Sequence, residues 1–195
     1  MFPSRVIVLP LLFCFAVMTV PAMAQTTNHP SEAGPHDYFK ADQEGVGGYL
    51  RLVESAHTRT INKWLNQGRL DNAIGDIKYT LDRFPNHPVS LQQLSVVAQM
   101  AKNTAVAVNY FERAISLFPH YAITRVQYGL FLVSINHVDA GLEHLKQAVE
   151  IEPKLLAGYK GLVHAYVKKG DLDQARDAAK KARELGYTGA LPGGL

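Results

Sequence analysis

Cysteine is almost absent from this sequence of 195 residues. The one cysteine, Cys14, lies in an apolar stretch near the N-terminus. Since no second thiol is available to pair with it, the disulfide-stapled folds of small secreted proteins are excluded. The chain is long enough to be stabilised by a buried apolar core instead.

The spacings that mark common catalytic and metal centres are also missing. The sequence contains no H-E-x-x-H zinc motif, no two histidines four residues apart, no G-x-x-x-x-G-K-[ST] phosphate loop and no G-x-S-x-G nucleophile turn. Paired acids such as Asp171 and Asp173 stand at the start of a predicted helix, where a carboxylate interacts favourably with the helix dipole. We therefore predict that the protein is not an enzyme and has no catalytic residue, no metal site and no cofactor.

Neither sign of charge dominates, because 20 lysines and arginines stand against 17 acids and give a formal net charge of +3. The Lys-Lys pairs at 168–169 and 180–181 have acids nearby in the sequence, a pattern typical of solvated helix faces. The charge balance therefore predicts no nucleic-acid partner and no adhesion to an anionic membrane.

The N-terminus carries the features of a secretory signal. Arg5 precedes an apolar run at residues 6–20, and the sequence PAMA follows, with Ala22 and Ala24 in the A-x-A arrangement that signal peptidase accepts. We therefore predict a signal peptide at residues 1–24.

Two membrane anchors are alternatives to a cleaved signal. The apolar run is shorter than the ~20 residues of a spanning helix and is interrupted by Pro10, which disfavours an uncleaved anchor. A lipid anchor on Cys14 is disfavoured because bulky Phe13 precedes it. The prediction is a periplasmic or secreted protein, cleaved near Ala24–Gln25, that contacts the membrane only if cleavage fails.

A proline-containing segment recurs along the rest of the chain. The sequences DRFPNHP, SLFPHYA and EIEPKLL contain Pro85, Pro119 and Pro153, which are spaced by 34 residues. A fixed period of this length is typical of helical repeat proteins. It divides the chain into four units, at 54–87, 88–121, 122–155 and 156–189.

Each unit has the pattern of two helices. In the fourth unit, Tyr159, Leu162, Val163 and Tyr166 follow helical spacing, and Gly170 then ends the helix. The other units break at Gly68, near Asn103 and near Asn136. Small residues follow each break and would let two helices approach closely: Ala73, Ala107, Ala114, Gly141, Ala148, Ala175, Ala179 and Ala182.

The period, the break followed by small residues, and the closing proline resemble the tetratricopeptide repeat family. The resemblance implies an all-α, right-handed solenoid of about four helix–turn–helix repeats over residues 49–187. The chain departs from the family at Ile61, Ser95 and Val163, where a small residue is usual, and conforms at Gly129.

The two ends differ from the repeats. Residues 25–48 are predicted to be a flexible segment with a possible short helix at 36–43, and 188–195 to be a loose tail.

The resemblance also implies which side chains line the concave groove. Its first half would offer amides, its centre would be apolar, and its last end would carry a cation and an imidazole. Carried over position by position, the lining residues are Thr58, Asn62, Leu65, Gln92, Val96, Gln99, Val126, Leu130, Val133, Lys160, His164 and Val167.

Such a groove suits an extended peptide or an amphipathic helix. Asn62 matches a clamp asparagine that some family members use for a C-terminal carboxylate, but Ile123 and Gln127 occupy the positions of the basic clamp residues. We therefore predict no carboxylate clamp.

The leading hypothesis is a non-enzymatic scaffold or adaptor of the bacterial periplasm. It would bind a peptide or helix of a partner protein in the groove and assist the assembly of an envelope complex. Three alternatives stay open: a small-molecule or metal binder using Tyr159, Lys160 and His164, a self-associating structural module that forms a homo-oligomer, and a groove covered by residues 36–48.

Overall fold

The computed structural model describes residues 34–195, and no strand occurs in that range. The predicted signal peptide at 1–24 lies outside the described residues. The elements, in chain order, are a 3-10 helix η2 (Tyr38–Lys40), α1 (Gly47–Val53), a π-helix η3 (Glu54–Thr58), α2 (Ile61–Asn66), α3 (Leu70–Arg83), α4 (Pro88–Met100), α5 (Thr104–Leu117), α6 (Ala122–Ser134), α7 (Val138–Ile151), α8 (Leu156–Lys169), α9 (Leu172–Glu184) and a 3-10 helix η4 (Pro192–Gly194). Over residues 34–195, no helix is both long and apolar enough to cross a membrane.

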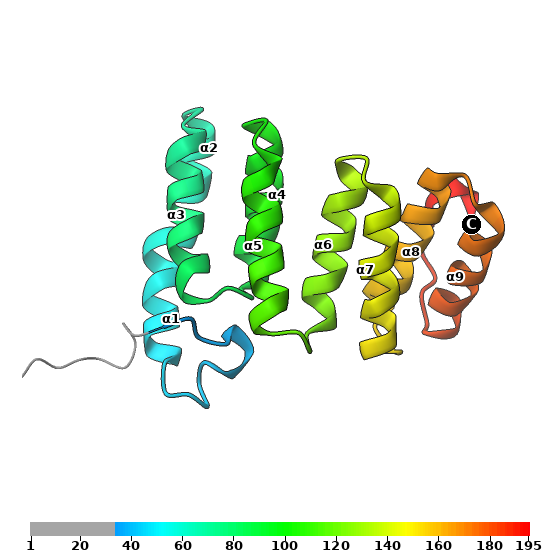
Figure 1. Cartoon of the computed structure of the whole chain (residues 1–195), viewed down its shortest axis with the longest axis horizontal. Coiled ribbons are helices and arrows are strands. Elements are labelled where there is room, and N and C mark those ends of the chain that lie inside the picture. The colour runs from blue at the N-terminus through cyan, green and yellow to red at the C-terminus, as the bar shows by residue number, and fades with distance from the viewer. Residues whose placement is uncertain (1–33) are drawn as a thin grey trace, which may run out of the picture.

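The helices form pairs that stack along the long axis of the molecule (Figure 1). The pairs are α2 with α3, α4 with α5, α6 with α7, and α8 with α9, one in each predicted unit. The all-α solenoid predicted from the 34-residue period is therefore confirmed. The first unit is less regular than expected, because its first helix is divided into α1, the π-helix and α2.

The turn inside each pair uses one residue with a positive φ. These residues are Gly68, Lys102, Asn136 and Gly170, and they are again spaced by 34 residues. The amide that follows each one donates to the carbonyl five residues back, as Asp171 does to Tyr166 over 3.0 Å. This is the bond of a Schellman motif, which satisfies carbonyls at the end of a helix. The first helix of each pair thus ends for the same local reason.

The second helix of each pair ends where the sequence predicts. The helices α3, α5 and α7 end at Arg83, Leu117 and Ile151, each two residues before a proline of the repeat. Proline cannot donate the amide hydrogen that a further helical turn would need.

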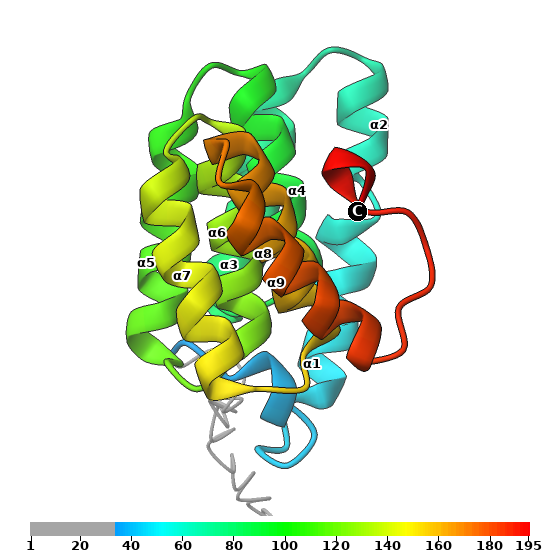
Figure 2. The ribbon, with the colours of Figure 1, turned by 90° about the vertical axis from the view of Figure 1, so that its right-hand side faces the viewer.

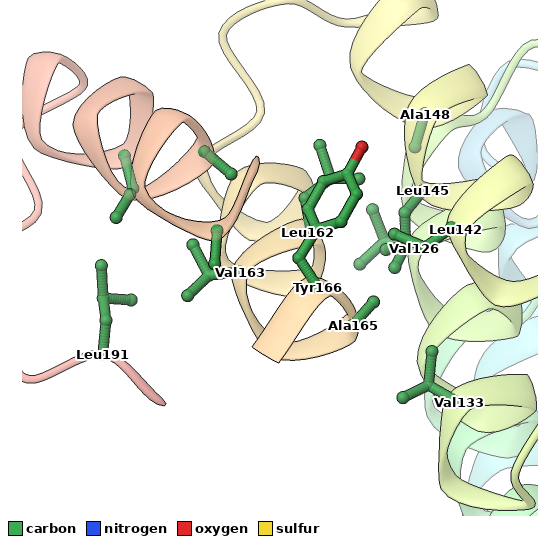
Figure 3. Packing of buried hydrophobic residues seen from close by; sticks show 14 of the residues in the cluster. Val126, Val133, Leu142, Leu145, Ala148, Leu162, Val163, Ala165, Tyr166 and Leu191 are labelled. Carbon is green, nitrogen blue, oxygen red and sulfur yellow. The ribbon is translucent and has the colours of Figure 1, made fainter. Parts of the chain in front are cut away.

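The core is built from the small and large positions of the repeats. Ala73, Ala107, Ala114, Ala148, Ala175 and Ala182 are all fully buried. One apolar cluster fills the first two repeats and reaches Tyr128, Phe131 and Leu132 of α6. A second cluster joins α6, α7, α8 and α9 (Figure 3). Each repeat therefore buries apolar surface both between its own two helices and against its neighbours.

The segment before α1 packs against the array, although the sequence suggested flexibility there. Asp37 is buried and accepts hydrogen bonds from Asn86 Nδ2 (2.7 Å) and from the hydroxyl of Tyr121 (2.6 Å). Ala41 and Val46 lie in an apolar cluster with Phe84. The expected short helix is the single 3-10 turn η2. In Figure 1 this segment lies at the end of α3 to α5 where the inter-repeat loops are found.

Residues 188–195, expected to be a loose tail, also return to the array. Leu191 is 6% exposed and belongs to the second apolar cluster. Figure 2 shows the tail in red, leaving α9 in a wide arc. The glycine-rich sequence of the tail gave no sign of this contact, which depends on Leu191, on Leu195 and on hydrogen bonds from Arg183 to the backbone.

Candidate peptide-binding groove

A pocket of about 240 Å³ lies between α2 and α4, the first helices of two successive repeats. Side chains one helical turn apart on each helix face the same space. The pocket is lined by Ile61, Asn62 and Leu65 from α2, and by Val89, Gln92, Gln93, Val96 and Val97 from α4.

The pocket combines apolar walls with an amide oxygen that has no partner. Val89 is 47% exposed and Val96 is 51% exposed, so both present apolar surface to solvent. The side-chain oxygen Oε1 of Gln93 is buried, and it accepts no hydrogen bond from the described part of the chain. A buried acceptor without a donor is costly. The pocket is therefore suited to a ligand that provides both a hydrogen-bond donor and an apolar group.

An aspartate from the neighbouring helix fixes α2 behind the pocket. The carboxylate of Asp76 on α3 accepts hydrogen bonds from Thr60 Oγ1 (2.6 Å) and Trp64 Nε1 (2.6 Å), and lies 3.0 Å from His57 Nδ1. Burial alone would raise the pKa of Asp76, but the bonds from Thr60, His57 and Trp64 outweigh it and lower that pKa. Asp76 is therefore a charged acceptor that positions the short helix α2.

Four of the predicted groove residues line this one pocket: Asn62, Leu65, Gln92 and Val96. Thr58 is half-buried at the end of the π-helix, and its hydroxyl has no hydrogen-bond partner among the described residues. Gln99 is exposed further along α4, and its amide bonds Ser95 and Ser134.

The predicted positions in the centre of the groove need a correction. Val126 is 2% exposed and Val133 is fully buried, so neither can contact a partner. The reason is the close approach of α6, α7 and α8 at glycine positions. A Cβ atom added to Gly141 would lie 2.6 Å from Val133 Cγ2, and one added to Gly158 would lie 3.8 Å from Val126 Cγ2. With no side chains in the way, the neighbouring helices enclose both valines.

The last end of the groove is occupied by the chain itself. Leu130 and Lys160 line a second pocket of about 310 Å³ with Ala190, Leu191 and Pro192 of the tail. Val167 lies under the tail, close to Gly193, whereas His164 is exposed. Leu130, Lys160 and Val167 thus lie in one region of the groove, and the tail covers part of that region.

Four residues of the first pocket, Ile61, Val89, Gln93 and Val97, are not among the groove residues predicted from the sequence. On α4, Gln93 lies one helical turn before Val96 and Val89 lies two turns before it. The helical spacing of the sequence could therefore have identified these two residues.

The structure also bears on the alternatives. No residue of 36–48 lines the pocket between α2 and α4. Tyr159 lines a depression between α8 and α9, whereas Lys160 lines the pocket beside the tail. Within residues 34–195 there is no group of three or more histidine, cysteine or acidic side chains that could hold a metal ion.

A comparison with protein-family models finds no match, and neither does a comparison with curated protein sequences. Solved structures do resemble this one. MamA from Desulfovibrio magneticus is 20% identical, with a TM-score of 0.52 over 75% of this chain and 89% of that chain. PilF from Pseudomonas aeruginosa is 18% identical, with a TM-score of 0.54 over 70% of this chain and 63% of that chain. YrrB, described as a TPR protein with an unusual peptide-binding site, is 16% identical, with a TM-score of 0.51 over 76% of this chain and 81% of that chain.

The chain has a tetratricopeptide-repeat fold. The similarity in sequence is low, so the comparison extends to the fold and not to the ligands of these proteins. In a tetratricopeptide array, the first helices of the repeats form one continuous face. The pocket between α2 and α4 and the pocket beside the tail lie on first helices, at the two ends of that face.

Proposed function

We propose that this protein is a non-enzymatic interaction scaffold of the bacterial periplasm, and that it binds a segment of a partner protein in the pocket between α2 and α4. The observation that carries the proposal is the unpartnered Oε1 of Gln93, buried beside the apolar side chains of Leu65 and Val96. YrrB, which shares the fold, is described as having a peptide-binding site.

The chemistry of the pocket favours an extended peptide over a helix. An extended chain offers free backbone N–H groups, and its side chains point alternately to two sides. One N–H group would satisfy Gln93, and the exposed amides of Asn62 and Gln92 would bond neighbouring peptide groups. A helix uses its N–H groups internally, so it would leave Gln93 unsatisfied. The expected ligand is therefore an extended segment with one apolar side chain inserted between Leu65 and Val96.

The location is proposed from the N-terminal signal, and the role from the location together with the fold. A scaffold of this kind would bring envelope proteins together during assembly of a complex. Fusion of residues 1–30 to a reporter that is active only after export tests the location. An inactive reporter would contradict it.

The peptide site can be tested without knowing the partner. The mature chain, from Gln25 on, is used to select binders from a displayed library of random linear peptides. Selected peptides are then titrated against variants by fluorescence anisotropy. We expect Val96→Asp to weaken binding at least about tenfold, because a charge in the pocket would have to be desolvated.

Leu172→Asp is the matched control, because Leu172 is similarly exposed (47%) but lies at the start of α9, outside the pocket. Its affinity should equal that of the unsubstituted chain. Gln93→Leu should lose binding to peptides whose N–H group bonds Oε1, with helical content unchanged. If the selected peptides bound the Val96→Asp chain as tightly as the unsubstituted chain, the pocket would not be the site.

A further inference from the structure

The tail and the face of α8 have the features of a bound peptide and its site. Leu191 is 6% exposed and belongs to the same cluster as Val163 of α8 (Figure 3). Val167 of α8 packs against this cluster. The next residue, Pro192, begins the 3-10 turn η4, and Leu191 N donates to Leu195 O over 3.2 Å to close that turn. Leu191 is therefore the most buried apolar contact of the tail, and a buried apolar residue of this kind commonly dominates the energy of an interface.

One arginine fixes the backbone of the tail. Arg183 of α9 donates from Nη1 to the carbonyl oxygens of Tyr187 (3.0 Å) and Gly189 (2.7 Å), and from Nη2 to that of Leu195 (3.1 Å). These contacts depend on the backbone and not on the identity of the side chains. Arg183 would therefore bind another segment in the same way if its backbone followed the path of the tail.

The close contact with α8 selects glycine after the Leu-Pro pair. Gly193 has a φ of 75°, and a Cβ atom at this position would lie 3.1 Å from Val167 Cγ2. A side chain here would be strained by both the backbone conformation and the contact. A segment that followed the path of the tail would therefore need glycine at this position.

The tail does not fill its site. A volume of about 310 Å³ stays open between Ala190 and Leu191 of the tail and the side chains of Leu130 and Lys160. The small side chain of Ala190 faces a space that could contain a much larger apolar group. The face accordingly has room for a ligand larger than the present one.

We infer that this face of α6 and α8 is a second peptide-binding site, for segments that contain an apolar residue followed by Leu-Pro-Gly and that form the same turn as the tail, and that residues 187–195 of the same chain are its resident, displaceable occupant. The site is separate from the pocket between α2 and α4. The inference deepens the proposed function, since it gives the class of ligand for the other end of the groove, but it can hold or fail independently of that pocket.

The test uses a fluorescent synthetic peptide with the sequence of residues 186–195 and the chain from Gln25 to Leu195. A tethered tail competes at an effective concentration of about 1 mM, so the original chain should bind micromolar peptide weakly. Leu191→Asp in the chain removes the anchor of the resident tail. We expect the peptide to bind this variant at least about tenfold more tightly than it binds the original chain.

Three controls identify the site. Adding Val167→Asp or Arg183→Ala to the Leu191→Asp chain should abolish the gain, whereas adding Val96→Asp should leave it unchanged. A peptide with Phe in place of Ala190 should bind more tightly than the natural sequence, because it enters the open volume. Hydrogen exchange of residues 187–195 should show that Leu191→Asp releases the tail.

Several results would overturn the inference. A tail that stays protected in the Leu191→Asp chain would show that Leu191 is not its anchor. A released tail without any gain in peptide binding would show that the face accepts no ligand in trans. A gain that survives both Val167→Asp and Arg183→Ala would place the binding elsewhere, and a gain lost with Val96→Asp would assign it to the first pocket.

Discussion

The hydroxyl of Tyr121 donates a hydrogen bond of 2.6 Å to the carboxylate of Asp37, across 84 residues of sequence. Asp37 also accepts from Asn86, and Asn86 in turn accepts from the amide of Tyr38 over 2.8 Å. Burial, and then the carboxylate of Asp37, raise the pKa of Tyr121 to about 12. The phenol therefore stays protonated and remains a donor at neutral pH. This network fastens the segment before α1 to the loops that close the first and second repeats.

Replacement of Asp37 by alanine should destabilise the protein by about 2–3 kcal/mol, because it removes a buried charged acceptor and leaves Asn86 and Tyr121 without their partner. Urea unfolding followed by circular dichroism measures this loss. His120→Ala is the control, since His120 is an exposed neighbour of Tyr121 and should have no effect. Equal stability of the Asp37→Ala chain and the original would show that the N-terminal segment contributes nothing to the fold.

The features that repeat with the 34-residue period could be predicted from the sequence. The helix ends before Pro85, Pro119 and Pro153 depend on local chemistry, and so do the turns at Gly68 and Gly170. The small positions that follow the turns are buried because the same pair of helices recurs four times. A periodic sequence therefore carries enough information to predict the array.

The contacts that occur once could not be predicted in this way. Asp37 and Tyr121 belong to different parts of the chain, and no spacing links them. The burial of Val126 and Val133 depends on how closely α8 and α7 approach α6, which is set by Gly158 on α8 and Gly141 on α7. Of the groove positions predicted from the family, those on α2 and α4 line a pocket, whereas these two valines are buried.

The carboxylate of Asp76 offers an optical test of the support behind the first pocket. Trp64 is the one tryptophan of the sequence, and its Nε1 donates to Asp76 over 2.6 Å. Asp76→Ala should remove this bond together with those from Thr60 and His57, and lower the free energy of unfolding by about 2 kcal/mol.

Tryptophan fluorescence of the folded chain should also change in intensity and wavelength, because the indole loses its charged acceptor. Asp71→Ala provides the comparison, since Asp71 is an exposed acid in the first turn of the same helix. If Asp76→Ala left both the spectrum and the stability unchanged, α2 would not depend on this carboxylate.

His87 should make the stability of the protein fall in mild acid. Its Nδ1 accepts from the amide of Ser90 (3.1 Å) and its Nε2 lies 3.1 Å from Glu54, so the neutral ring with its proton on Nε2 satisfies both. Burial lowers the pKa of His87, and the carboxylate of Glu54 only partly opposes this. The unfolded chain therefore takes up a proton at a higher pH than the folded chain does. The contribution is fully present above about pH 6.5 and is lost as the pH falls through the lower folded pKa.

Urea unfolding at pH 7.5, 6.5 and 5.5 measures how the free energy of unfolding falls with pH. His87→Asn keeps an acceptor for the start of α4 and cannot titrate, so its stability should decline less over this range. His144 also has a pKa lowered by burial, but it titrates in both proteins and cancels in the comparison. Parallel curves for His87→Asn and the original chain would assign the acid sensitivity to other groups.

The turns inside the repeats allow a comparison between two equivalent positions. Lys102 has a φ of 53° and Gly170 has a φ of 86°, and both are the left-handed residue of a Schellman turn. A residue with a Cβ atom is disfavoured in this conformation by about 1–2 kcal/mol relative to glycine, and the greater entropy of an unfolded glycine offsets part of the gain. Lys102→Gly should therefore raise the free energy of unfolding by about 0.5 kcal/mol, and Gly170→Ala should lower it by about 1 kcal/mol.

Chemical unfolding of the two variants distinguishes backbone strain from the loss of a side-chain contact. Lys169→Ala is the control, because Lys169 immediately precedes Gly170. Lys169 bonds Asp139 over 2.7 Å at an exposed position, so its removal should change stability little. Opposite signs for Lys102→Gly and Gly170→Ala would show that one conformational requirement recurs in the second and fourth repeats. Destabilisation by Lys102→Gly would show instead that the lysine side chain contributes more to the fold than its backbone strain costs.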